Sequence, residues 1–266
     1  MTTLFLFAHQ DDEIGVFHAL NAAKKRGERL SCVFLTDGVW KGVTSARRNA
    51  ESKKCLTKLG LTPSEMTFLG TSAAVPNGLL VEHLQHCFDS LCQHVVQLAL
   101  DGQPVSRVIM HAWEGGHHDH DAVHIIGLAL AKQFGLLEQS RQFPLYRNPS
   151  GRWTMTFATP LASNGAVESI SIPISQRLKY LGLLASYGSQ KRVILQLFPH
   201  IANHYVRAGA QRLQQLSLER VYSEPNTPPM LYEKWKLYSY ARFRQHADPF
   251  IARHLPLAPH AQEKSA

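Results

Sequence analysis

Short apolar segments alternate with amphipathic segments along the first 140 residues, and this rhythm limits the folds open to the chain. The first apolar segment, residues 3–8, lacks polar alternation, as strands buried on both faces do. Further strands are expected at 29–35, 66–69 and 107–110, and helices at 14–26, 44–59, 79–100 and 121–134. Strands and helices in this order predict βαβ units, a mostly parallel sheet and right-handed crossovers. We therefore expect an α/β fold.

The rhythm changes after residue 140. Strands are expected at 153–158 and 170–174, one helix at 175–185, and further helix over 189–216. The sequence contains no internal repeat and no low-complexity segment. We expect a single domain over 1–266, with an α/β core over 1–140. A mixed or helical extension over 141–266 would shape the mouth of a binding site.

The positive charge of the chain is concentrated in its last third. The formal net charge is +8, yet residues 1–174 carry 15 Lys and Arg against 15 Asp and Glu. Residues 175–266 carry 13 against 5. Such a region either forms a solvated helical surface or attracts phosphates, anionic sugars or membrane headgroups. We expect no nucleic-acid partner.

The four cysteines, Cys32, Cys55, Cys87 and Cys92, form no C-x-x-C pair, so we interpret them as free thiols in strands and helices. No stretch approaches the roughly 20 apolar residues that span a bilayer. The N-terminus also lacks the basic segment of a signal peptide. The sequence therefore predicts a cytoplasmic protein.

Two clusters of histidine and acidic residues follow two of the expected strands. His9–Glu13 comes after the first strand, and His117–Asp121 comes after the fourth. In open parallel sheets, ligands bind beyond the carboxyl ends of the strands, so both clusters should meet at one edge. Singly, they have ordinary explanations: acids favoured at a helix N-terminus, or a surface histidine tract. Jointly, they favour a site.

The residue types suit a catalytic zinc ion, which takes three protein ligands and keeps one open position. His9 and Asp12 are three residues apart, so a turn can aim both at one point. His120 can supply the third ligand from the second cluster. Iron or cobalt would accept the same His and Asp ligands.

The remaining ionisable residues suit acid–base chemistry beside the metal. Asp11 can remove a proton from water. His117, as an imidazolium, can stabilise an oxyanion or protonate a leaving amine. Asp119 can orient His117 by a hydrogen bond to its ring. Glu13 is left without a chemical role.

The two clusters resemble the signature motifs A-H-P-D-D-E and H-P-D-H of the PIG-L/LmbE-like deacetylases. Further similarities at Thr36–Gly38, Arg47–Glu51 and Ser189–Gln190 extend the resemblance over about residues 3–190. The resemblance implies a Rossmann-like fold. It also implies hydrolysis of N-acetyl groups, mostly on glucosamine-containing substrates, with a divalent metal that is usually zinc.

The resemblance assigns the same roles to the clustered residues. It implies that His9, Asp12 and His120 are metal ligands, that Asp11 is the general base, that His117 stabilises the tetrahedral intermediate, and that Asp119 orients His117. Gln10 and His118 depart from the family pattern, because each replaces a proline of the motifs. Proline supplies rigidity and no ligand, so we expect altered loop stiffness or specificity and intact chemistry.

Candidate substrate contacts are less clearly marked. Arg47 or Arg48 matches a substrate-contacting arginine of the family by resemblance. Trp113 and Tyr187 could stack on a sugar ring, although most such aromatic residues belong to the core. The expected partner is a small amino sugar or sugar conjugate, neutral or anionic. The alternatives are a noncatalytic sugar- or nucleotide-binding protein and an amidase of larger conjugates.

Overall fold

The computed structural model describes residues 1–149 and 155–257. A seven-stranded sheet lies at the centre, in the order β3-β2-β1-β4-β5-β9-β8. Its parallel strands are β1 (Thr2–Phe7), β2 (Arg29–Phe34), β3 (Met66–Thr67), β4 (Val105–His111) and β5 (Arg141–Phe143). Strands β9 (Ala210–Gln215) and β8 (Val167–Ser171) extend it in the antiparallel sense. The expected α/β fold with a mostly parallel sheet is confirmed.

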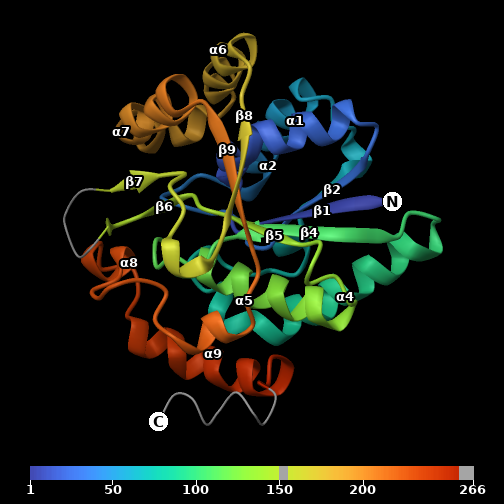
Figure 1. The fold of residues 1–266 in the computed structure, drawn as a ribbon, viewed down its shortest axis with the longest axis vertical. Coiled ribbons are helices and arrows are strands. Elements are labelled where there is room, and N and C mark those ends of the chain that lie inside the picture. Colours follow the sequence, from blue (N-terminus) through green and yellow to red (C-terminus); the bar gives the residue numbers. More distant parts are fainter. Residues whose placement is uncertain (150–154, 258–266) are drawn as a thin grey trace.

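Helices cover both faces of the sheet, as Figure 1 shows. One face is covered by α1 (Phe17–Lys25), α2 (Ser45–Lys58), α6 (Ile174–Leu183) and α7 (Lys191–Ala202), and the other by α4 (Leu84–Leu100), α5 (His118–Gln133) and α9 (Tyr240–His254). Short helical turns are α3 (Leu69–Ser72), α8 (Leu231–Lys234), η1 (Asp12–Val16), η2 (Pro63–Glu65), η3 (Leu80–His83), η5 (Ala162–Asn164), η6 (Leu184–Ser186), η7 (Gly188–Gln190), η9 (Glu219–Tyr222) and the π-helical η8 (Asn203–Ala208).

The central strand β1 contributes side chains to both cores. Leu4 and Leu6 belong to the apolar cluster under α4, α5 and α9, and Phe5 and Phe7 to the cluster under α1, α2, α6 and α7. Because successive side chains of a strand point to opposite faces, an unbroken apolar run suits a strand covered on both sides. This is the physical reason for the missing polar alternation in the sequence.

The chain changes direction across the sheet between β1 and β4. It runs outward from β1 through β2 to β3 and then returns to pair β4 with the other edge of β1. A crevice forms beyond the carboxyl ends of two strands at such a switch point. Both ionisable clusters follow these two strands, so the topology brings them to this crevice.

The extension after residue 140 differs from the sequence-based expectation. The helix expected over 189–216 ends at Ala202, and Ala210–Gln215 forms β9 instead. Gly209, in the left-handed region at φ 56°, terminates the preceding helical turn. In β9, alternate residues then face the core, which suits a strand.

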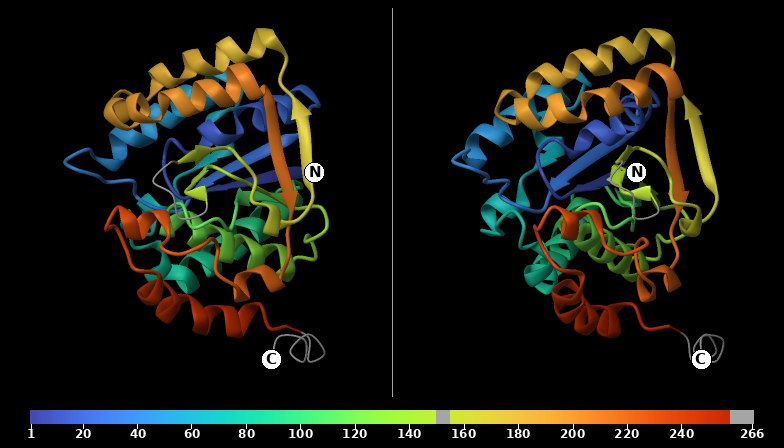
Figure 2. Two further views of the ribbon diagram at one scale, coloured as in Figure 1. Left: turned by 60° about the vertical axis from the view of Figure 1, so that its left-hand side comes forward. Right: turned by 90° about the vertical axis from the view of Figure 1, so that its left-hand side faces the viewer.

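The expected strand at 153–158 is a short one, β7 (Thr156–Phe157), paired with β6 (Tyr146–Arg147); Trp153 and Thr154 lie outside the described residues. The helix α9 lies against α5 in both views of Figure 2. None of the helices within the described ranges is both long and apolar enough to cross a membrane.

Candidate active site

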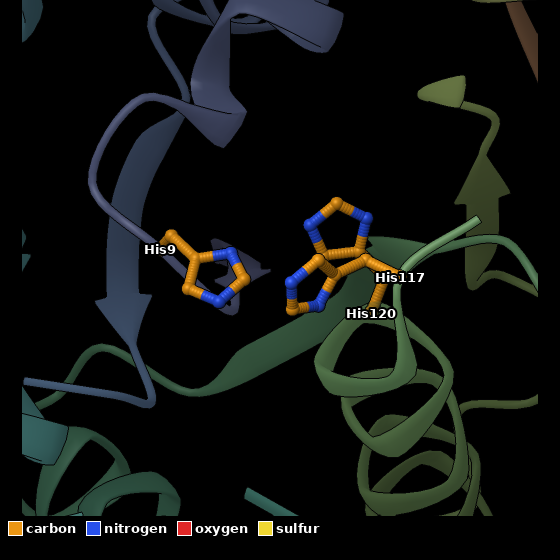
Figure 3. Close-up of side chains that lie close together, drawn as sticks. All are labelled: His9, His117 and His120. Atoms are coloured by element: carbon orange, nitrogen blue, oxygen red, sulfur yellow. The ribbon is translucent and has the colours of Figure 1, made fainter. Parts of the chain in front are cut away.

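The loops after β1 and β4 bring the two ionisable clusters together. His9 comes from the β1 loop, and His117 and His120 come from the start of α5, and their rings face one another in Figure 3. Nitrogen atoms of these three side chains lie within 4.8 Å of one another. The sheet topology therefore brings together residues that are more than one hundred positions apart in the sequence.

Asp12 is the point at which the predicted ligands converge. One of its carboxylate oxygens lies 3.1 Å from His120 Nε2. The other lies 3.5 Å from His9 Nδ1 and accepts a hydrogen bond from the His9 backbone nitrogen at 2.7 Å. Burial favours the neutral acid, but the surrounding histidines outweigh it and hold the pKa of Asp12 well below its usual range. Asp12 is therefore a buried carboxylate surrounded by imidazole rings.

His111 is a member of this cluster that the sequence analysis missed. It is the last residue of β4 and fully buried. Its Nε2 lies 3.1 Å from Asp12, and its ring stacks on His120 with centroids 4.0 Å apart. Asp12, His111 and His120 thus form a second group with ligand atoms within 4.8 Å. The only feature of the sequence that could have indicated His111 was its place at the end of the strand that leads to the second cluster.

The two proposed histidine ligands differ in protonation state. Burial lowers the pKa of His120 to about 4, so this ring is neutral, the form in which imidazole binds metals. Burial also opposes charge on His9, but the carboxylates of Asp12 and Asp119 raise the pKa of His9 to about 10. Within the described residues, both ring nitrogens of His120 are buried without a hydrogen-bond partner. The Asp12 carboxylate and the neutral ring of His120 are donors that fit a divalent metal, and His9, which this pKa leaves protonated, would lose its proton on binding one.

Asp11 faces the cavity and is paired with a buried arginine. Its carboxylate lies 3.0 Å from Arg48 Nη2. Burial raises the pKa of Asp11 to about 6, against the effect of Arg48. Arg48, on α2, also donates to the backbone oxygens of Gly38 and Gln10. A carboxylate whose pKa is close to neutral is suited to accept a proton from water.

Glu13 gains a role from its hydrogen bond to the backbone of Asp11. Asp11 has a φ of 129°, a conformation that is strained for a residue with a side chain. The buried Glu13 carboxylate accepts a hydrogen bond from the Asp11 backbone nitrogen at 2.9 Å. Glu13 therefore holds the unusual backbone that points the Asp11 carboxylate into the cavity.

Asp119 contacts a different partner from the one expected. Its carboxylate accepts hydrogen bonds from His9 Nε2 at 2.9 Å and from the backbone nitrogens of Gly78 and Leu80. In the described part of the chain, no hydrogen bond joins this carboxylate to the ring of His117. The Asp119 backbone nitrogen instead donates to His117 Nδ1 at 3.1 Å. Asp119 thus orients His9 through its carboxylate and His117 only through its backbone.

The backbone hydrogen bond fixes the tautomer of His117. Burial lowers the pKa of His117 well below its ordinary value, so the ring is neutral. Since Nδ1 accepts the hydrogen bond from Asp119, the proton of the neutral ring is on Nε2. His117 lines the cavity and thus offers it a neutral N–H donor. The imidazolium expected from the sequence is not the form that this burial favours.

The two residues that replace motif prolines connect the site to neighbouring loops. Gln10 donates through Nε2 to Asn49 Oδ1 on α2 at 2.7 Å. His118 Nε2 lies 2.8 Å from the Gly78 backbone oxygen, and its ring stacks on Tyr238 with centroids 4.6 Å apart. Side-chain contacts therefore take over the stiffening that proline would give these loops.

Three of the four expected substrate contacts do not line the cavity. Trp113 is fully buried against α9 and donates to the Ser223 backbone oxygen, and Tyr187 is 1% exposed in the core. Arg47 lies on the surface, paired with Glu51. Of the four, Arg48 lines the cavity. The exposed aromatic residues at the cavity are instead Trp40 and Trp235, which are 41% and 44% exposed and which composition alone could not single out.

A cavity of about 830 Å³ opens over the ionisable cluster. His9, Asp11, Asp12 and His117 form its polar side. The opposite wall is apolar and comes largely from α7 and the β6–β7 region. Pockets of this size hold ligands larger than one sugar ring. The cluster is therefore open to a sizeable organic molecule.

The loop between β4 and α5 is fixed by two buried carboxyl groups. Glu114 Oε1 accepts from the backbone nitrogens of Leu145 and Tyr146 at 2.8 and 3.0 Å. Asp121 accepts from those of Glu114 and Gly115. Burial raises the pKa of Glu114 to about 8. In the native state this group therefore keeps a proton that the unfolded chain releases near pH 4.5.

Replacement of Glu114 by glutamine should flatten the pH dependence of stability. Between pH 4.5 and about 8 the native state binds the extra proton, so the Glu114 contribution to stability falls as pH rises. Gln keeps an oxygen for Leu145 and Tyr146 and does not titrate. The unfolding free energy of Glu114→Gln, relative to the parent, should rise by about 1 kcal/mol per pH unit across this window. Urea unfolding of both proteins at several pH values measures this difference. A difference that stays constant between pH 4.5 and 8 would contradict the prediction.

Comparisons with known proteins agree with this geometry. The PIG-L family model, described as GlcNAc-PI de-N-acetylase, matches residues 4–131. No curated protein matches the chain. Similar solved structures include A40926 pseudoaglycone deacetylase, at 16% identity and a TM-score of 0.57, with 81% of this chain and 96% of that one covered.

Two further structures share the fold. The zinc-inhibited form of teicoplanin deacetylase is 12% identical, with a TM-score of 0.57 and coverage of 82% of this chain and 98% of that one. N,N'-diacetylchitobiose deacetylase from Pyrococcus horikoshii is 15% identical, with a TM-score of 0.54 and coverage of 81% and 82%. At such identities these likenesses show the fold. The match over residues 4–131 includes both motifs and the whole histidine and aspartate cluster, so this region of the chain is similar to the PIG-L family.

Proposed function

We propose that this protein is a zinc-dependent N-deacetylase that releases acetate from an N-acetylglucosamine-type or related amino-sugar substrate. The observation that carries the proposal is the convergence of His9, His120 and the Asp12 carboxylate beside a cavity that Asp11 also lines. The family and the deacetylases among the similar structures support the reaction type. A cytoplasmic location stays a prediction from the sequence.

The ligands would be His9, Asp12 and His120. His111 contacts the Asp12 carboxylate and is not among the proposed ligands. The three proposed ligands would hold a divalent metal, which would supply polarisation of an amide carbonyl and a lowered pKa for a water molecule. Asp119 would keep His9 oriented, because its carboxylate accepts the Nε2 proton and leaves Nδ1 toward Asp12. Zinc is favoured among the ions that this donor set accepts, and iron and cobalt are alternatives.

The reaction adds water to the acetamide carbon and breaks the C–N bond. Asp11 would accept a proton from the water, since its carboxylate faces the cavity and its pKa lies near neutrality. The Nε2–H of His117 would donate a hydrogen bond to the oxyanion that develops on the carbonyl oxygen. The proton taken by Asp11 would pass to the departing nitrogen, which leaves as the free amine with acetate as the second product.

Removal of the Asp11 carboxylate tests the proposal directly. Asp11→Asn should lower kcat by about 100-fold or more, the usual contribution of a general base. Zinc content should stay at the parent level, because Asp11 is not among the proposed ligands. Acetate release from a panel of N-acetylated amino sugars and zinc content by mass spectrometry provide the readouts. Undiminished activity in Asp11→Asn, or activity unaffected by chelation of the metal, would exclude the mechanism.

Glu13 offers a second test, directed at the backbone of Asp11. Glu13→Ala should lower kcat by about 10- to 100-fold, as loss of a supporting contact does. Zinc binding and KM should change little. Glu13→Gln retains an oxygen that can accept from the Asp11 backbone, so it should recover most of the activity. Equal losses in both variants would show that the hydrogen bond to Asp11 is not the relevant contact.

The charge at the mouth favours an anionic substrate. Lys41 and Lys236 line the cavity, and among the described residues neither makes an ion pair. The acidic side chains that line it there, Asp11 and Asp12, belong to the polar side of the cluster. An anionic group on the substrate would therefore meet uncompensated positive charge, which salt screens.

This charge predicts a salt effect on KM. For a phosphorylated N-acetylhexosamine, KM should rise with ionic strength, whereas for the uncharged parent sugar it should not. The double substitution Lys41→Gln with Lys236→Gln should abolish the difference between the two substrates. Lys132→Gln, on α5 and outside the cavity lining, is the matched control. A salt-independent KM for the phosphorylated sugar would indicate recognition of a neutral group.

A further inference from the structure

The apolar wall of the cavity is part of the protein core. Ile14, Leu145, Phe157, Ile194 and Ile201 all line the cavity, and none is more than 8% exposed. They belong to one apolar cluster under α7 and come from four separate segments of the chain. Since these side chains are buried and still border the cavity, they form the apolar side of its inner end, and buried polar residues such as His9, Asp12 and Gln190 border it as well.

The mouth has the opposite character. Trp40, Lys41, Trp235 and Leu237 line the same cavity and are exposed. Asn77 adds an amide at this side. Aromatic and charged groups thus lie where solvent enters, whereas the side chains of the apolar wall have no hydrogen-bonding atoms. A bound molecule would place its apolar part inward and its polar part outward.

This division fits the two halves of an N-acyl amino sugar in one orientation. Sugar hydroxyl groups against the inner wall would lose their hydrogen bonds to water and gain no partner. An alkyl chain would instead gain from transfer out of water. The amine half therefore suits the mouth, and the acyl half suits the inner wall. An acetyl group, with a single methyl, leaves most of this wall uncovered.

We propose that the inner wall binds the alkyl chain of an acyl group longer than acetyl, so that the protein is a deacylase for medium-chain N-acyl amino sugars. This rests on the amide hydrolysis proposed above and specifies the acyl group. Water adds to the amide carbon, the C–N bond breaks, the amine leaves with a proton, and the acyl chain leaves as a fatty acid.

A chain-length series on one amino sugar tests the acyl preference. The zinc-loaded protein is given the acetyl, butyryl, hexanoyl and octanoyl amides of glucosamine, and the free amine is quantified. Specificity, kcat/KM, should rise by about fourfold per added methylene until the wall is covered. Highest kcat/KM for the acetyl amide would overturn the acyl assignment and leave the deacetylase proposal standing. Failure to cleave any of the four amides would overturn both.

A pair of substitutions on α7 locates the chain binding. Leu197 is partly buried and lines the cavity, whereas Leu195, two residues earlier, is 68% exposed and lies outside its lining. Leu197→Trp fills the space and should lower the octanoyl-to-acetyl ratio of kcat/KM at least tenfold. Leu195→Trp is the matched control and should keep the parent ratio. An unchanged ratio in Leu197→Trp would overturn the proposal.

If circular dichroism shows that Leu197→Trp does not fold, a second variant tests the same position of the acyl chain. Val193, one helical turn before Leu197, also lines the cavity and is 40% exposed, so a tryptophan there disturbs the core less. Val193→Trp should lower the same ratio, and retention of the parent ratio would count against binding of the chain along α7.

Discussion

The Asp12 carboxylate is the interaction on which the rest of the site depends. It is 4% exposed, and His9, His111 and His120 lie around it. A buried carboxylate without compensating partners would be costly, so its retention requires positive charge or hydrogen-bond donors at short distance. The junction of β1 and β4 supplies these from two loops, and a divalent cation would complete the compensation. Fold and ligand cluster are thus coupled through one ionised group.

The outer contacts of the cluster explain how loops can hold it. Asp119 connects His9 to the backbone of the segment before η3, and His118 bonds to the same segment from the other direction. Arg48 connects Asp11 to the loop after β2. Each loop at the edge of the sheet is therefore bound to at least one other, and their positions depend on one another.

Much of the fold and the convergence of the two ionisable clusters could be predicted from the sequence, because both depend on local pattern and strand order. The apolar run of β1 marked a central strand, and parallel strands present their carboxyl ends at one edge, so His9, Asp12 and His120 had to meet. The partner of Asp119 could not be predicted, since Gly78 and Leu80 approach it only after the chain has folded. His111 was missed because a lone histidine at a strand end has no spacing signal.

Burial of Trp113 and exposure of Trp40 depend on tertiary packing, which composition does not reveal. The strand β9 was mistaken for helix because its residues are also good helix formers. Its pairing with β5, which the sequence does not show, makes this segment a strand.

The wall contributed by α7 has a consequence for how this chain can diversify. The ligand cluster lies within residues 4–131, whereas α7 and β7 lie after them. The proposed metal ligands and the part of the cavity wall that α7 and β7 contribute are thus encoded in separate, consecutive stretches of the sequence. Replacement of a few side chains in the second stretch can redirect the protein to new molecules while the first is inherited intact.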